Sequence, residues 1–185
     1  MEYKKDIENL FHTLKEFFHT RERVFEKVIE LSIRRLKVGG KVLIFGNGGS
    51  AAQAQHFAAE LVNKFLKTRP ALPALSLTTD TSALTSIAND TSFDFVFSRQ
   101  VEALGTRKDI AVGLSTSGNS LDVINAMKVA RDIEMMTVAF TGKGGGELSF
   151  LVDYLLDAPS DYTPRIQEVH LFLLHLLAQE IEKGI

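Results

Sequence analysis

The segment KVLIFGNGGSAAQAQHF (41–57) places a short apolar run before a glycine-rich turn and the start of a helical pattern. A continuously apolar run is typical of a strand buried on both faces, because a strand with one wet face alternates apolar and polar residues. Four more apolar runs follow, each separated from the next by helical patterns. They lie at 74–77, 109–114, 136–140 and 152–156. This order predicts an α/β fold with a five-stranded, doubly wound parallel sheet.

Helical patterns surround these runs. The first spans Lys4 to Lys37, with Thr20 as a candidate break between two apolar stripes. The glycine pair at 39–40 is expected to end this helical segment. Helices are also expected from Ala51 to about Phe65 and from Leu121 to Arg131. Two short helices are expected within 81–104, and a long helix from Thr163 to Lys183. We expect residues 1–185 to form a single domain, with 1–38 as an N-terminal helical arm used in oligomerisation.

Composition excludes several classes of protein. The 185 residues carry 21 Lys and Arg against 23 Asp and Glu, a net charge of −2 without runs of like charge, which disfavours nucleic-acid or membrane-surface partners. The absence of cysteine excludes disulfides, thiolate metal ligands and a thiol nucleophile. The N-terminus is a charged amphipathic segment rather than a signal peptide, so a cytoplasmic location is expected.

Two polar loops at predicted strand ends suit an anion. One is Gly46-Asn47-Gly48-Gly49-Ser50, and the other is Ser115-Thr116-Ser117-Gly118-Asn119-Ser120. Each joins a strand to a helix, whose first N–H groups and partial positive charge attract phosphate. The simpler alternative for the second loop is that Asn119 or Ser120 caps the next helix. The first loop also fits a dinucleotide fingerprint, but Asp80, the candidate ribose ligand, comes too late in the chain.

Acid–base groups fall on two helical segments. His56 and Glu60 are four residues apart, the spacing of a metal-ligand pair and equally of a helix-surface ion pair. Gln167 and His175 are eight apart, about 12 Å along a helix, so long side chains could still meet at one ion. His170 is interpreted as a polar residue at a helix surface or interface. The Asn89-Asp90 pair is either a C-cap or Asx turn, or a partner for a substrate hydroxyl.

Six segments together resemble the sugar-isomerase (SIS) domain and, within that superfamily, the phosphoheptose isomerases. They are GNGGSAAQAQHFAAEL (46–61), RPALPALSL (69–77), IAND (87–90), LSTSGNS (114–120), TGKGGGEL (141–148) and RIQEVHLFLLH (165–175). The resemblance implies an enzyme that makes heptose 7-phosphate from sedoheptulose 7-phosphate for the lipopolysaccharide core. It also implies a homotetramer whose active sites combine helices of neighbouring chains. Pro164 stands where some members carry an acidic residue.

The resemblance also implies roles for individual residues. Glu60 matches the catalytic base and His175 the acid. The zinc ligands would be His56, Glu60, Gln167 and His175. Substrate contacts would be Asn47, Gly48, Gly49, Glu60, Asn89, Asp90, Ser115, Thr116, Ser117, Ser120 and Gln167. Zinc could polarise the substrate carbonyl, but a carboxylate bound to zinc is a poorer base, so Glu60 alternates between the two roles or the metal is structural.

A non-catalytic SIS protein is the alternative, one that binds a replication initiator or senses a sugar phosphate. Ketose-to-aldose isomerisation needs a base at the carbons and an acid at the oxygens. Glu60 and His175 supply that pair, which the non-catalytic binders lack, and the chain has no basic face or extra DNA-binding helices. The sequence therefore favours the isomerase.

Overall fold

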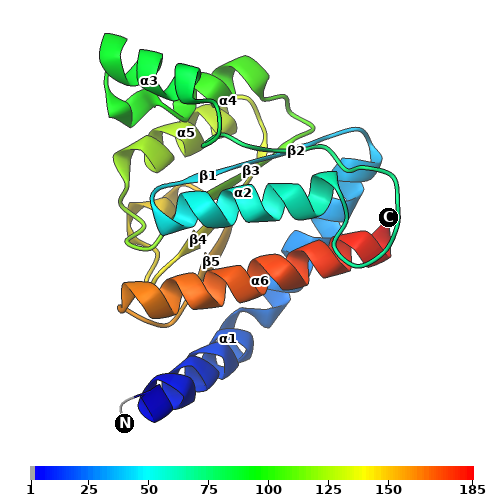
Figure 1. The fold of residues 1–185 in the computed structure, drawn as a ribbon, viewed down its shortest axis with the longest axis vertical. Helices are drawn as coiled ribbons and strands as arrows, with labels where there is room; N and C mark the ends of the chain where they lie inside the picture. The colour runs from blue at the N-terminus through cyan, green and yellow to red at the C-terminus, as the bar shows by residue number, and fades with distance from the viewer. Residues whose placement is uncertain (1–2) are drawn as a thin grey trace.

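The computed structural model describes residues 3–185 and contains one parallel sheet of five strands in the order β2-β1-β3-β4-β5 (Figure 1). The strands are β1 (Val42–Gly46), β2 (Ala74–Ser76), β3 (Ile110–Ser115), β4 (Met136–Thr141) and β5 (Tyr154–Asp157). The three central strands β1, β3 and β4 are buried along their whole length, which explains their unbroken apolar sequences. The predicted fold class and all five strands are confirmed, with strand ends shifted by at most two residues.

Helices cover both faces of the sheet (Figure 1). One face carries α1 (Tyr3–Lys37), α2 (Gly49–Val62) and α6 (Thr163–Gly184), and the other carries α3 (Thr81–Asp90), α4 (Ser98–Leu104), α5 (Leu121–Asp132) and the 3-10 turns η1 (Phe93–Phe95) and η2 (Gly146–Phe150). Neighbouring strand residues point to opposite faces. In β1, Ile44 therefore joins the core under α6, while Leu43 and Phe45 join the core under α5.

The N-terminal arm is one unbroken helix over its described residues, so the predicted break at Thr20 is wrong. The Thr20 hydroxyl donates to the carbonyl oxygen of Glu16 at 3.0 Å, which lets a threonine remain inside a helix. Phe18 and Phe25 pack edge to face across the same stretch, with ring centroids 6.2 Å apart. The predicted glycine end is confirmed, since Gly39 has a φ of +84°.

The first and last helices lie side by side and run in the same direction (Figure 1). Near their starts, Arg165 Nε donates to Asn9 Oδ1 at 2.8 Å. Near their ends, the Gly184 backbone packs so closely on the Ile33 side chain that a Cβ at position 184 would lie 2.4 Å from Ile33 Cδ1. The α6 helix therefore lies between α1 and α2 on one face of the sheet.

The α2 helix ends at Val62, three residues before the predicted end. Glu182, a buried residue near the end of α6, accepts hydrogen bonds from the backbone N–H groups of Phe65, Leu66 and Lys67 at 2.8–2.9 Å. Burial acts to raise the pKa of Glu182, but these hydrogen bonds and the charge of Arg69 outweigh it, so the pKa is lowered. A distant carboxylate thus fixes the loop that follows α2.

Candidate functional site

The two glycine- and hydroxyl-rich loops lie next to each other at one edge of the sheet. The direction of strand order reverses between β1 and β3, and Gly46 at the end of β1 is in register with Leu114 in β3. In open parallel sheets, ligands bind at this reversal, beyond the carboxyl ends of the strands. The structure therefore places both predicted anion loops where the fold offers its binding crevice.

The first loop turns sharply and packs against α6. Gly48 has a φ of +54°, a left-handed conformation that favours glycine, and α2 has no side-chain N-cap. A Cβ at Gly49 would lie 2.7 Å from Nε2 of Gln167, so the Gln167 amide sits directly on the loop backbone. Asn47 Nδ2 donates to Asp122 Oδ2 at 2.8 Å, which gives the Asn47 amide an internal partner. The loop thus offers the Gly48 and Gly49 backbone to a ligand.

The hydroxyl groups of the second loop converge. Ser115 Oγ lies 2.9 Å from Ser120 Oγ and 3.5 Å from Ser117 Oγ. Ser120 occupies the N-cap position of α5 without a side-chain capping bond, and Asn119 Oδ1 accepts from the backbone N–H of Glu147 instead. Ser120 is therefore the N-cap residue of α5, as the capping alternative expected, although its hydroxyl makes no capping hydrogen bond. Clustered hydroxyls at a helix start match the several oxygens of a phosphate.

Asp122, which sequence reasoning missed, joins the two loops. It lies in the first turn of α5 and is 4% exposed. Burial raises its pKa, while the hydrogen bond from Asn47 acts in the opposite direction. The sequence does place this carboxylate two residues after the hydroxyl loop. An Asp in the first turn of a helix is usually explained by its favourable interaction with the helix dipole, so its position alone does not indicate a contact with Asn47.

His56, Glu60 and His175 come together within one chain. His56 Nε2 lies 2.8 Å from His175 Nε2 and 3.3 Å from Glu60 Oε1. Two imidazole nitrogens this close cannot both carry a proton, so one donates to the other. Burial, together with the charge of His56, lowers the pKa of His175, and Glu60 opposes this shift. An imidazole beside a carboxylate can supply the acid and the base of a proton transfer.

The predicted metal ligands are only partly assembled. Gln167 is held elsewhere: its amide rests on Gly49, and its backbone oxygen accepts from Gln53 Nε2 at 2.7 Å. Within residues 3–185, no group of three His, Asp or Glu side chains has the arrangement of a metal site. The facing nitrogens of His56 and His175, with a carboxylate beside them, nevertheless form the type of donor set that zinc prefers.

Asn89 and Asp90 lie apart from these groups. They are the last two residues of α3, both exposed, and Asn89 Nδ2 donates to Asp90 Oδ1 at 2.9 Å. The C-cap position belongs to Thr91. The structure thus places the pair on the helix layer opposite α2 and α6, and the hydrogen bond found for their side chains within residues 3–185 joins them to each other rather than to either anion loop.

The interpretation of His170 as a surface or interface residue is wrong. Its side chain is completely buried between α6 and the sheet, with Nε2 2.9 Å from the carbonyl oxygen of Thr141 and its ring against Phe140. Burial lowers its pKa to about 4, so the ring is neutral. The signal was present in the sequence: position 170 follows buried Ile166 by four residues, on the same side of the helix.

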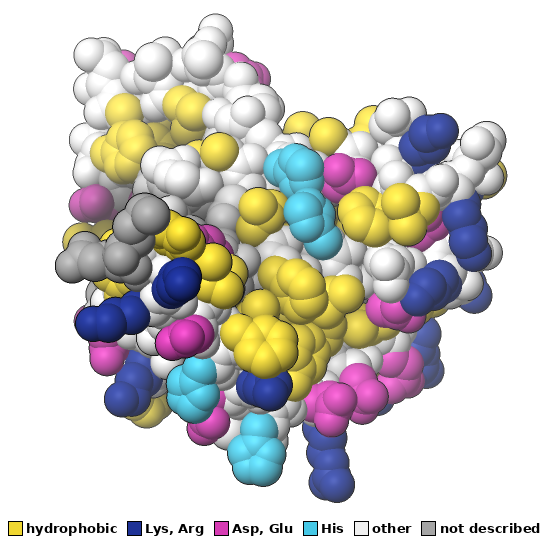
Figure 2. Space-filling model, turned by 60° about the horizontal axis from the view of Figure 1, so that its bottom comes forward, with side chains coloured by type: hydrophobic (Ala, Val, Ile, Leu, Met, Phe, Trp, Pro, Cys, Tyr) yellow, Lys and Arg dark blue, Asp and Glu magenta, His cyan; other side chains and the backbone are white. Residues whose placement is uncertain are grey.

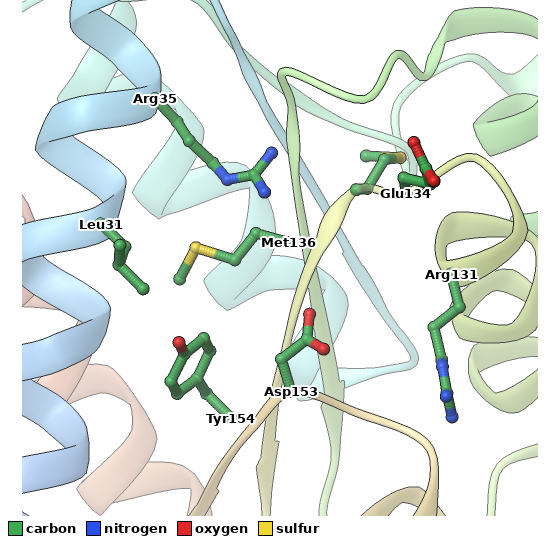
Figure 3. A pocket seen from close by; sticks show the side chains of 8 residues that line it. Leu31, Arg35, Arg131, Glu134, Met136, Asp153 and Tyr154 are labelled. Atoms are coloured by element: carbon green, nitrogen blue, oxygen red, sulfur yellow. The ribbon is translucent and has the colours of Figure 1, made fainter.

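A cavity of about 410 Å³ lies at the opposite edge of the sheet (Figure 3). Figure 3 shows Arg35 reaching into it from α1, with Asp153 at the start of β5. Both groups have structural partners. Arg35 donates to the carbonyl oxygens of Arg107 and Asp109, and Asp153 accepts from the backbone N–H of Thr137. Arg35 and Asp153 therefore hold neighbouring stretches of backbone in place.

The histidine pair is accessible from solvent. A cavity of about 230 Å³ beside His56 is lined by Ala52, Gln53 and Leu171. Figure 2 shows two adjacent histidine side chains next to an acidic one, bordered by a broad hydrophobic area. The acid–base group is therefore reachable, and the surface around it is apolar.

No helix within residues 3–185 is long and apolar enough to cross a membrane.

Comparison with known proteins agrees with this architecture. The SIS domain family matches residues 2–142. Phosphoheptose isomerase 1 of Campylobacter jejuni is 55% identical over 85% of this chain and 85% of its own, and phosphoheptose isomerase of Aliarcobacter butzleri is 50% identical over 94% and 92%. The structure of phosphoheptose isomerase from Neisseria gonorrhoeae superposes with a TM-score of 0.92 at 42% identity, covering 98% of this chain and 97% of that one.

Proposed function

Because the chain belongs to the phosphoheptose isomerases of the SIS-domain family, and is a sugar-phosphate isomerase of heptose biosynthesis, we propose that it converts D-sedoheptulose 7-phosphate into D-glycero-D-manno-heptose 7-phosphate. The observation that carries the proposal is the meeting of Glu60, His56 and His175 in a chain that also has two anion loops at the switch point of its sheet. The product would serve the lipopolysaccharide core, in the cytoplasm.

The proposed reaction moves one proton between neighbouring carbons. Glu60 removes a proton from C1 of the ketose, the C1–C2 double bond forms, and His175 gives a proton to the C2 oxygen, yielding a cis-enediol. His175 then takes the proton of the C1 hydroxyl while Glu60 returns its proton to C2, which leaves an aldehyde at C1. Protons and electrons balance without a co-reactant. The lowered pKa of His175 makes its ring a stronger acid for the first of these steps.

The phosphate group would be held by Ser115, Thr116, Ser117 and Ser120, with the Gly48 and Gly49 backbone facing the sugar. This end of the substrate does not react, so its binding energy serves to place C1 and C2 against Glu60. Asn89 and Asp90, which lie away from the loops in the single chain, would contact substrate only in an assembly. This supports the proposal of a homotetramer with active sites shared between chains.

We also propose that His56, Glu60 and His175 hold one zinc ion per subunit, with Gln167 completing the set after its side chain leaves Gly49. A bound zinc would polarise the carbonyl oxygen as a Lewis acid. The residues fit this group because His56 Nε2 lies 2.8 Å from His175 Nε2 and 3.3 Å from Glu60 Oε1. His56 and His175 must be unprotonated at these nitrogens to bind metal.

The test is to incubate the protein with sedoheptulose 7-phosphate, with and without added zinc, and to follow the aldose by NMR. A manno-configured heptose 7-phosphate is the expected product. Metal analysis of a sample never exposed to chelator should find about one zinc per chain, as the ligand set requires. Binding of the sugar phosphate without turnover would overturn the isomerase and favour a non-catalytic sensor or binder.

A further inference from the structure

The glycine-rich segment 142–148 supports the hydroxyl loop from behind. The Gly142 N–H donates to the carbonyl oxygen of Thr116 at 3.0 Å, and the Leu148 N–H donates to that of Gly118 at 3.1 Å. A Cβ at Gly118 would lie 2.0 Å from the carbonyl oxygen of Gly145, so the two backbones touch. These contacts fix the position of Lys143 relative to the hydroxyl loop.

Lys143 reaches a cavity that the hydroxyl loop also lines. The cavity has a volume of about 210 Å³ and lies between the loops that follow β3, β4 and β5. Its polar lining consists of Thr116, Ser117, Lys143, Ser160, Asp161 and Thr163. The Lys143 backbone N–H donates to the carbonyl oxygen of Ser160 at 3.1 Å, which anchors the residue at the rim.

The charge of Lys143 has no partner within residues 3–185, since the residue takes part in none of the ion pairs found there. Among the residues that line this cavity, Lys143 is the one with a positively charged side chain. Asp161 also lines the cavity, but it forms no ion pair with Lys143. A lysine that is anchored at its backbone, has no ion-pair partner in the described part of the chain and shares a cavity with Thr116 and Ser117 is equipped to bind an anion.

We propose that Lys143 is the cation that recognises the phosphate group of the substrate, and that it selects a phosphorylated ketose over a neutral one. This inference rests on the proposed function. The hydroxyls of the 115–120 loop are neutral donors, whereas a phosphate dianion binds more strongly to a charged donor. The flexible Lys143 side chain supplies that charge from the segment that supports the loop.

The test compares Lys143→Met and Lys143→Arg with Lys128→Met, a control that removes an exposed lysine on α5. Lys143→Met should raise the KM for sedoheptulose 7-phosphate about 10- to 100-fold, the loss expected for one hydrogen bond to a charged group. Its kcat should stay within about twofold, because the phosphate binds equally in the ground and transition states. Lys143→Arg should restore most of the affinity, and Lys128→Met should match the wild type.

Binding of inorganic phosphate, followed by 31P NMR, separates this inference from the proposed function. If the wild type does not isomerise the heptulose, the function fails, yet weaker phosphate binding by Lys143→Met would still support the lysine's role. An unchanged KM and unchanged phosphate binding in Lys143→Met would overturn the inference while the isomerase stands. Equal damage from Lys143→Arg and Lys143→Met, or a kcat loss without a KM change, would also overturn it.

Discussion

Glu60 lies one helical turn after His56 on α2, with its carboxylate directed at the histidine pair. Exchange for glutamine keeps the shape and removes the base, so Glu60→Gln should lower kcat by about 10²- to 10⁴-fold, the usual contribution of a general base. Circular dichroism and thermal unfolding should be unchanged. Glu102→Gln, which alters an exposed carboxylate paired with Arg99 on α4, is the matched control. Wild-type turnover by Glu60→Gln would refute the mechanism.

His170 makes stability depend on pH. Its pKa is about 4 in the folded protein, against an ordinary value of 6.5. Between these values the unfolded chain binds a proton that the folded chain does not, so stability is full above pH 6.5 and falls as the pH is lowered toward 4. The total loss is about 3 kcal/mol, and below pH 4 both states are protonated and the loss stops.

Urea unfolding at pH 7 and pH 4.5 measures this dependence. Comparison with His170→Gln isolates the contribution of one ring, because the other histidines are common to both proteins. The variant should lose less stability than the wild type over this interval. Parallel pH profiles for the two proteins would show that burial of His170 does not control the acid sensitivity.

At the scale of single residues, the sequence indicated which residues carry chemistry but not which side chains they contact. The i, i+4 spacing of His56 and Glu60 was readable, and the structure brings both to His175. The sequence indicates the burial of His170 only when the apolar residues on the same side of the helix, such as Ile166, are considered with it. The Asn47–Asp122 bond joins residues 75 positions apart, a separation that local patterns do not report.

Among the elements, β1 and β3 are joined at their starts by a single carboxylate. Asp109, 1% exposed, accepts from the Lys41 backbone N–H at 2.8 Å, from Lys41 Nζ at 2.6 Å and from the Thr106 backbone N–H at 2.8 Å. Asp109→Ala leaves these donors without an acceptor and should destabilise the fold by about 3–5 kcal/mol. Asp132→Ala, an exposed change at the end of α5, should alter stability by less than about 0.5 kcal/mol.

Chemical denaturation checks this prediction, and activity at low temperature provides a second measurement. Asp109 lies at the edge of the sheet opposite the binding crevice, so the folded variant should keep its kcat. A stability loss no larger than that of Asp132→Ala would mean that water replaces the carboxylate at little cost.

Strands and helices could be predicted from the sequence where one physical effect determined the pattern of residues. Buried parallel strands produce unbroken apolar runs, and all five were found. The ends of α2 and the continuity of α1 were not, because they depend on distant groups. Glu182, more than a hundred residues away, holds the chain after α2, and aromatic packing of Phe18 and Phe25 carries α1 through Thr20.

At the scale of the whole molecule, the arm carries an unprotected apolar stripe. Tyr3, Ile7 and Phe11 follow one another at intervals of four residues and are 51%, 62% and 61% exposed. Such a stripe is expected to be covered in an assembly. The wild type should therefore have four times the chain mass of 20.5 kDa by light scattering. The double change Ile7→Lys with Phe11→Lys should reduce that mass.

Phe150→Lys, which alters an exposed phenylalanine on η2, serves as the control and should leave the mass unchanged. A dissociated arm variant should also lose activity if neighbouring chains complete the site. Full turnover by a monomeric variant would show that each chain works alone, which the grouping of His56, Glu60 and His175 within one chain already makes chemically feasible.

The parallel contact between α1 and α6 has a consequence for biosynthesis. A ribosome completes α1 long before α6, yet the apolar face of α1, with Phe17 and Val28, is covered partly by α6. Until residues 163–184 leave the exit tunnel, the nascent chain displays an amphipathic helix and a face of the sheet that α1 and α2 cover only in part. Incomplete chains of this kind are prone to aggregate, so chaperones should associate with the growing polypeptide until α6 has emerged.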